Sequence, residues 1–301
     1  MKQFLEKFAI CKMFFLVFIF SSCSKNIDLT LSGHSEKLTA AYFEGAGQMH
    51  NANLDNILVD LSNERSGVYK SLTSIGSNVV NTEFARSNML NLAKNASIQQ
   101  TNNDQNLPPQ LKNDMVIQTN IIYQDAPIWD NVNLFTLTTS SKFTDFQQSF
   151  LSQLNVIISD NDESMNSLLK RISNLEENIY QSSLSQIQQA EIFIITSTAK
   201  SSLSYWNQNI NKWTIFIDET RVSSKEGLTF DIKGFSIKSN LSKKISWKKV
   251  AKSDVGGAVA GVAAWGGAAL MGGPVTLAAF GSSVGGWAAG CSAYEAIMQL
   301  W

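Results

Sequence analysis

The sequence has few of the residues from which metal and catalytic sites are built. It holds only two histidines and three cysteines in 301 residues, and neither an H-x-x-x-H nor a C-x-x-C spacing occurs. A zinc site is therefore not expected. The phosphate-binding pattern G-x-x-x-x-G-K is missing as well. The acidic run at 160–163 lacks the glycine and the spaced carboxylates of a calcium loop. We expect neither a metal nor a cofactor.

An excess of positive charge is also missing. The chain has 24 basic and 25 acidic residues, and an N-terminal leader over 1–22 would take three lysines and one glutamate with it. The remaining 21 basic and 24 acidic residues leave a net charge of −3. A chain without global basic character is not expected to bind nucleic acid.

The leader is indicated by a basic start, an apolar run at 13–20 and the small residues that follow. The run has eight residues, whereas a membrane-spanning helix needs roughly 20. It ends in Phe20-Ser21-Ser22-Cys23. This resembles a lipobox, in which an apolar residue and two small ones precede the cysteine that receives lipid. Phe20 and Ser22 depart from the usual Leu and Gly or Ala, and the alternative is an ordinary signal peptide with an incidental cysteine.

Lipidation of Cys23 would leave one other cysteine in the mature chain. Cys11 belongs to the leader, so only Cys291 remains and no intramolecular disulfide is available. Cys291 lies among small apolar residues, where we expect a buried side chain. The resulting expectation is a lipid-anchored protein of the cell envelope, at the outer membrane, attached to membrane lipid through acylated Cys23.

Helical periodicity dominates the middle of the chain, so the expected fold class is mainly α. Residues 23–40 form a lipidated tether and residues 41–240 a mainly helical polar domain. Apolar spacing predicts helices over 41–64 and 82–97, with a proline-containing linker at 99–110 that should form no packed element. Residues 111–123 and 142–158 fit either helix or strand.

The clearest periodicity follows a helix start signal at 160–162. Apolar residues then recur at intervals of three or four, a seam that favours core packing over partner binding; they are Met165, Leu168, Ile172, Leu175 and Ile179. A second helix is predicted over 184–206, packed antiparallel on the first. Residues 213–239 contain β-like runs, and we expect a small β-hairpin there.

Residues 241–301 combine a basic flank with a glycine-rich stretch. No charged residue occurs from Val255 to Tyr294, and eleven of the 18 glycines lie between Gly256 and Gly290. Pairs four residues apart place glycines on one helix face, where a neighbouring backbone can approach closely. Gly272-Gly273-Pro274 breaks the run, which predicts a helical hairpin with arms at 254–271 and 275–299. The predicted helix-packing glycines are Gly257, Gly261, Gly281, Gly285, Gly286 and Gly290.

This hairpin can lie in lipid or on the protein body. Its first arm would measure about 27 Å, close to the hydrocarbon thickness of about 30 Å. Alanine and glycine dominate, however, so its hydrophobicity is marginal. Five lysines precede it and would contact phosphate headgroups if the hairpin dips into a membrane, or lie in a solvated loop otherwise; they are Lys243, Lys244, Lys248, Lys249 and Lys252.

Two motifs contain residues typical of catalytic sites, but neither has the partners that catalysis would require. Gly281-Ser282-Ser283-Val284-Gly285 matches the G-x-S-x-G elbow of hydrolases, but no histidine follows it in the chain. His50 starts a short polar run to Asp55, which we interpret as a capping cluster. We therefore expect no enzyme and assign no catalytic residue.

Three features occur together: His50-Asn51…Leu54-Asp55, then Ser204-Tyr205-Trp206…Asn209…Trp213, and the glycine-rich tail after Asp254. In combination they resemble uncharacterised exported lipoproteins of bacteroidete-type bacteria, a resemblance that implies no activity. The tail also resembles glycine-zipper segments of membrane-active peptides and two-peptide bacteriocins. The aromatic cluster is interpreted as core packing, with a ligand platform as the alternative.

The sequence thus favours a non-catalytic envelope lipoprotein. Its tail would mediate helix packing, self-association into a homo-oligomer, or membrane contact. The alternative is a membrane-permeabilising, bacteriocin-like or toxin factor whose hairpins assemble in a target bilayer.

Overall fold

The computed structural model describes the chain from residue 38 onward, in ranges separated by gaps. These ranges are 38–74, 82–103, 105, 109–124, 142–160, 162–226, 246–269 and 274–300. They belong to one compact unit, Glu36–Trp301. The predicted signal peptide and lipobox, the tether up to residue 37, and Lys243 and Lys244 lie outside the described residues.

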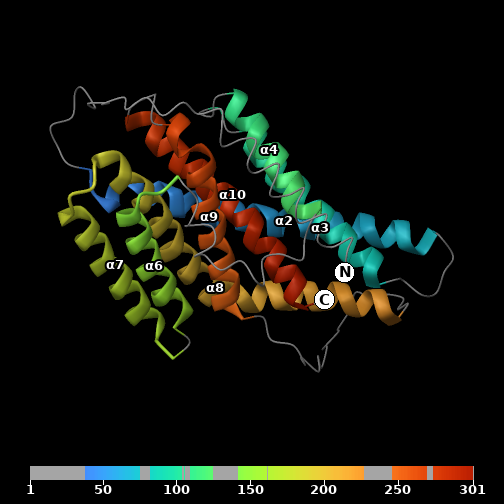
Figure 1. The fold of residues 1–301 in the computed structure, drawn as a ribbon. Helices are drawn as coiled ribbons and strands as arrows, with labels where there is room; N and C mark the ends of the chain where they lie inside the picture. Colours follow the sequence, from blue (N-terminus) through green and yellow to red (C-terminus); the bar gives the residue numbers. More distant parts are fainter. Residues whose placement is uncertain are drawn as a thin grey trace, which may run out of the picture. The chain divides into compact units, whose positions relative to one another are not determined.

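Within these ranges the chain is mainly helical, as predicted, and contains no strand (Figure 1). The short 3-10 helix η1 covers Ala40–Phe43. The helices of the first half are α2 (Glu44–Ser74), α3 (Thr82–Asn103), α4 (Pro109–Gln124) and α6 (Asp145–Ser159). Those of the second half are α7 (Met165–Gln181), α8 (Gln186–Glu226), α9 (Trp247–Ala269) and α10 (Pro274–Leu300).

Helix α7 follows its sequence pattern closely. The predicted seam is buried at Leu168, Ile172, Leu175 and Ile179, and it packs on α8 and α6. The predicted start at 160–162 is wrong by a few residues. Ser164 is the N-cap, and its hydroxyl accepts a hydrogen bond from the backbone N–H of Ser167.

Helix α6 begins with a capping box. The Thr144 hydroxyl accepts from the Gln147 backbone N–H, and the Gln147 side chain accepts from the Thr144 N–H. This pair satisfies two of the backbone groups that a helix start leaves unpaired. Both segments whose sequence fitted either helix or strand are helical. Residues 142–158 mostly form α6, and residues 111–123 lie in α4.

Two expectations are corrected. Trp213 to Ile217 form no strand but continue α8, because Trp206, Trp213 and Ile217 recur at intervals that place all three in the core. The rest of the predicted β-hairpin, from 227 on, lies outside the described residues. The predicted linker at 99–110 is partly helical, since α3 runs to Asn103 and buries Thr101, whose hydroxyl donates to the Ser97 carbonyl.

The predicted glycine-rich hairpin is confirmed, but its first arm begins at Trp247, seven residues before the predicted start at 254. Helix α9 ends at Ala269 and α10 begins at Pro274, on either side of the predicted break. The two arms pack on each other, and α10 packs against α2, α3 and α8 as well. Figure 1 shows both arms crossing α2 and α8. The charge-free segment therefore supplies a central part of the core.

Candidate functional site

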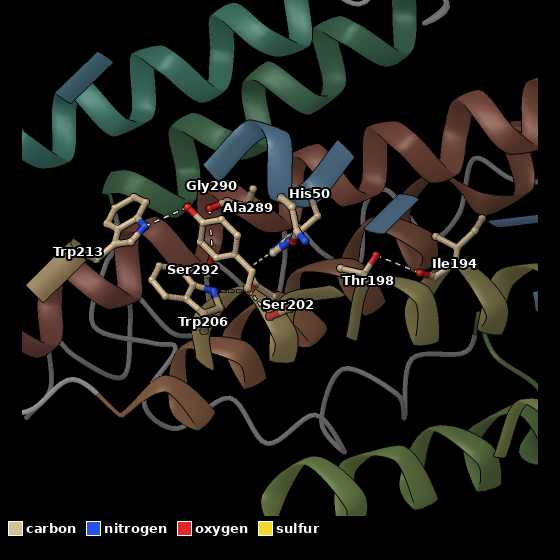
Figure 2. A network of polar contacts seen from close by, with 12 residues as sticks. His50, Ile194, Thr198, Ser202, Trp206, Trp213, Ala289, Gly290 and Ser292 are labelled. Atoms are coloured by element: carbon tan, nitrogen blue, oxygen red, sulfur yellow. Dashed lines mark hydrogen bonds and ion pairs between the residues drawn. The ribbon is translucent and has the colours of Figure 1, made fainter. Parts of the chain in front are cut away.

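Polar side chains from α2, α8 and α9 meet inside this apolar core (Figure 2). His50 comes from α2, Ser202 and Trp206 from α8, and Asp254 from α9. All four side chains are fully buried. Buried polar groups are costly unless they find partners, so the contacts within this polar cluster determine how the three helices fit together.

Asp254 is the centre of the polar cluster. Its Oδ2 accepts a hydrogen bond from the Ser202 hydroxyl at 2.5 Å and another from the Trp206 indole N–H at 2.9 Å. Its Oδ1 lies 3.0 Å from His50 Nε2. This last contact falls outside the geometry of an aligned hydrogen bond, and neither atom has another hydrogen-bond partner. It is best described as a buried ion pair.

The His50 ring is held on its other side by its neighbour in α2. The Nδ1 atom lies 2.8 Å from the Asn51 side-chain oxygen, a distance that suits donation from an Nδ1–H. Burial by itself would lower the pKa of the imidazole. The charge of Asp254 and the polar contacts with Asp254 and Asn51 outweigh burial, so the pKa lies above its ordinary value of 6.5. The arrangement therefore favours an imidazolium facing a carboxylate.

An aromatic chain connects the polar cluster with the surface. The Trp213 N–H donates to the Tyr205 hydroxyl at 3.2 Å, and that hydroxyl donates to Asp55 at 2.9 Å. The Trp206 ring contacts both of these rings, with centroids 5.4 Å from Tyr205 and 5.2 Å from Trp213. The predicted core role of these aromatics is confirmed by their burial. Burial, together with the charges of Asp55 and Asp254, raises the pKa of Tyr205 well above its usual range.

The three segments that carry the lipoprotein resemblance thus meet at one place. The interpretation of His50 as part of a capping cluster is wrong, since the ring lies inside α2 and is fully buried. Its spacing of four from Leu54 and seven from Ile57 puts it on the buried face of the helix. That spacing could have revealed the burial. Nothing in the sequence indicated Ser202 as a partner of Asp254.

The predicted helix-packing glycines of α10 lie against other helices. A Cβ at Gly285 would fall 2.0 Å from the backbone oxygen of Ala46 in α2. Cβ atoms at three further glycines would approach other side chains: Gly281 faces Ile194, Gly286 faces Asn53, and Gly290 faces Ser97. The Tyr123 hydroxyl of α4 donates to the Gly290 carbonyl at 2.9 Å.

In α9, Gly257 and Gly261 are both buried. A Cβ at Gly257 would lie 3.0 Å from the Cys291 sulfur and 3.2 Å from the Ala288 Cα. Cys291 is buried and free, as expected. Gly47, which the sequence did not single out, is as tightly placed, because its added Cβ would overlap Ser201 and the Ser197 carbonyl of α8.

Two described lysines of the basic flank, Lys248 and Lys252, contact the end of α6 and the turn that leads to α7. Lys248 donates to the backbone oxygens of Asp160 and Glu163 at 2.7 and 3.2 Å. Lys252 donates to the Ser159 hydroxyl at 3.1 Å. Lys249 lies in the same first turns of α9. Two of these ammonium groups therefore help to fix the start of the hairpin.

The structure also bears on three other questions raised by the sequence: the G-x-S-x-G segment, metal binding and membrane-spanning helices. The G-x-S-x-G segment lies inside α10 and lacks the strand and turn that an elbow requires, and Ser283 is buried. Within the described ranges, no three acidic, cysteine or histidine side chains gather as a metal site would need. None of the helices in the described part of the chain combines the length and hydropathy needed to cross a bilayer.

No family model matches the chain, and neither a curated protein nor a solved structure was found to be similar to it. The function therefore has to be argued from the chain itself. Chemically, the polar cluster can hold one proton and one buried charge pair at the junction of α2, α8 and α9.

Proposed function

We propose that this chain is a non-catalytic lipoprotein of the cell envelope, anchored at the outer membrane through acylated Cys23, and that its glycine-rich hairpin serves as the internal core of the helical body. The observation that carries the second part is the contact of Gly285 with the backbone of Ala46. A methyl group does not fit there, so the glycine face of α10 is occupied by α2.

This packing bears on the three roles that the tail could have. Gly281, Gly285 and Gly290 face residues of α8, α2 and α3 within the same chain. A second copy could not use these faces without displacing those helices, and lipid could not reach them. Internal helix packing is therefore favoured over self-association and over membrane contact through the glycine face. The same reasoning disfavours the permeabilising alternative, which needs the hairpin to leave the body.

The proposed anchor rests on the leader and its lipobox-like end at Cys23. Stable membrane attachment takes more than one acyl chain, and a tri-acylated cysteine meets that condition. The helical body would then stand at the membrane surface without inserting. Its function would lie in the exposed faces of the helices, which present the body to partners in the envelope.

Cell fractionation with metabolic acyl labelling tests both parts. We expect wild type to carry label and to sediment with membranes, and Cys23→Ala to be unlabelled and released into the soluble fraction. Cys291→Ala is the matched control, because it removes the other cysteine of the mature chain and should keep both label and membrane attachment.

Two outcomes would contradict the proposal. If wild type stays in the cytosol, unlabelled and still carrying Met1, the anchor does not exist. If unlabelled Cys23→Ala remains with the membranes, the body itself binds lipid. Leakage of a fluorescent dye from anionic vesicles on addition of the Cys23→Ala protein would then favour the permeabilising function.

A further inference from the structure

Asp254 is the last charged residue before the charge-free stretch that runs from Val255 to Tyr294. It lies in α9, and its partners lie in α2 and α8. The glycine contacts hold the two arms of the hairpin to each other, since Gly257 faces Ala288 and Cys291. The Asp254 contacts tie the first arm to the rest of the body. This polar attachment is fully buried, so its strength depends on whether its charges are balanced.

We propose that the His50–Asp254 ion pair is a proton-dependent latch, which holds α9 against α2 and α8 while His50 is protonated and loosens that helix when the proton is lost. The inference rests on the proposed role of the hairpin as an internal core. It adds a regulation of that core by the pH of the compartment.

The groups that face the ion pair explain why His50 controls it. From α8, Ser202 and Trp206 donate to Asp254 but carry no charge. Tyr205 of α8 and Cys291 of α10 both have raised pKa values, chiefly through burial and in part through the Asp254 charge, and so stay neutral. Among these groups, His50 alone can supply the positive charge that balances Asp254.

The direction of the effect follows from linkage between proton binding and docking. The fold raises the pKa of His50 above 6.5, so the docked state binds this proton more tightly than an open state does. The contribution of the ion pair to docking is therefore complete below about pH 6.5 and is lost as pH rises through the higher pKa of the docked state. A single proton changes the docking equilibrium by at most about tenfold per pH unit.

Once His50 has lost its proton, Asp254 has two neutral donors, Ser202 and Trp206, and no positive partner. A buried charge that loses its partner is strongly destabilising. The lysines that fix the start of α9 contact the end of α6 and the turn that leads to α7, away from the polar cluster. They do not replace His50, so α9 is expected to loosen in the turns that follow Asp254.

Hydrogen exchange of the purified mature protein, followed by mass spectrometry from pH 6 to pH 9 and corrected for intrinsic exchange rates, tests the latch. We expect amides of α9 to lose protection as pH rises in wild type, with a larger fall in α9 than in α7. His50→Gln should reduce α9 protection at pH 6 by about a hundredfold and abolish the pH step.

Two further variants separate the latch from a general loss of stability. Glu176→Gln breaks the 2.7 Å ion pair with Lys200 between α7 and α8. Because this pair does not involve His50 or Asp254, the variant should keep the pH step in α9. The double variant His50→Gln with Asp254→Asn removes both charges while leaving polar side chains in place. Its α9 helix should be protected at pH 6 and show no pH step.

The outcomes are distinguishable. Wild-type α9 that is equally protected at pH 6 and pH 9 would overturn the latch and leave the internal core intact. A pH step that persists in the double variant would also overturn it. If α9 and α10 exchange freely at every pH, both the latch and the proposed internal core are wrong.

Discussion

Replacing Gly285 with alanine adds one methyl group to α10 at the point where this helix touches the backbone of α2. The new Cβ would lie 2.0 Å from the carbonyl oxygen of Ala46 and 2.9 Å from its carbonyl carbon, whereas ordinary contacts lie at 3.4–4 Å. The overlap is with backbone, so no change of rotamer relieves it. The two helices have to move apart by more than an ångström.

Two opposing effects set the size of the change. Alanine is favoured over glycine inside a helix by up to about 1 kcal/mol. Inserting a methyl group into a tightly packed core costs about 1–3 kcal/mol, occasionally more, and the overlap with backbone places Gly285 at the upper end. We expect Gly285→Ala to lower the free energy of unfolding by about 2 kcal/mol. For a body of this size that corresponds to a fall in Tm of about 4–8 °C.

Gly281→Ala is the matched control in the same helix, one turn away. Its Cβ would meet side-chain carbons of Ile194 at 3.1 and 3.5 Å, and a side chain can shift by a few tenths of an ångström. The helix-propensity gain should roughly offset that cost and leave Tm nearly unchanged. Differential scanning calorimetry of both variants and wild type measures the difference. A Gly285→Ala protein as stable as Gly281→Ala, or more stable than wild type, would refute the packing argument.

Three further predictions concern individual contacts. Tyr123→Phe removes the hydroxyl that donates to the Gly290 carbonyl and should lower the free energy of unfolding by about 1 kcal/mol in urea titrations; an unchanged midpoint would contradict the contact. Thr144→Ala removes the capping box of α6 and should cost about 1 kcal/mol, seen as a lower Tm; Thr144→Ser should retain most of the stability. Burial raises the pKa of Glu191 to about 7, against a smaller lowering by its hydrogen bond with Gln147. The fold therefore holds the Glu191 carboxyl best in its protonated form, and wild type loses stability as pH rises from about 4.5 to about 7. Glu191→Gln should match wild type at pH 4.5 and exceed it by about 2 kcal/mol at pH 8, allowing for partial exposure; equal urea midpoints at both pH values would contradict the raised pKa.

The elements that local sequence governs were the ones that could be predicted. The seam of α7 and the break at Pro274 depend on spacing and on the missing N–H of proline, which act within a few residues. The C-terminal hairpin followed from the same kind of signal. The strand predicted at Trp213 to Ile217 was wrong because β-branched and aromatic residues favour strands only weakly. In the fold, burial of this segment beside Trp206 favours the helix.

The polar cluster could be predicted only in part. The helical spacing of His50, Leu54 and Ile57 was enough to indicate that the histidine is buried. Its pairing with Asp254 joins helices from opposite ends of the chain, and no local pattern encodes such a contact. A single sequence indicates which side chains need partners, and the arrangement of the helices determines which partners they find.

Helix α10, the last described helix of the chain, packs on α2, which is its first long helix. Contacts between such distant segments form late, because the chain between them must be ordered first. During synthesis, which starts at the N-terminus, α2 would lack its principal partner until α10 is made. Assembly of the centre therefore requires α10, and a chain truncated before α10 would be left with an open, apolar α2 surface.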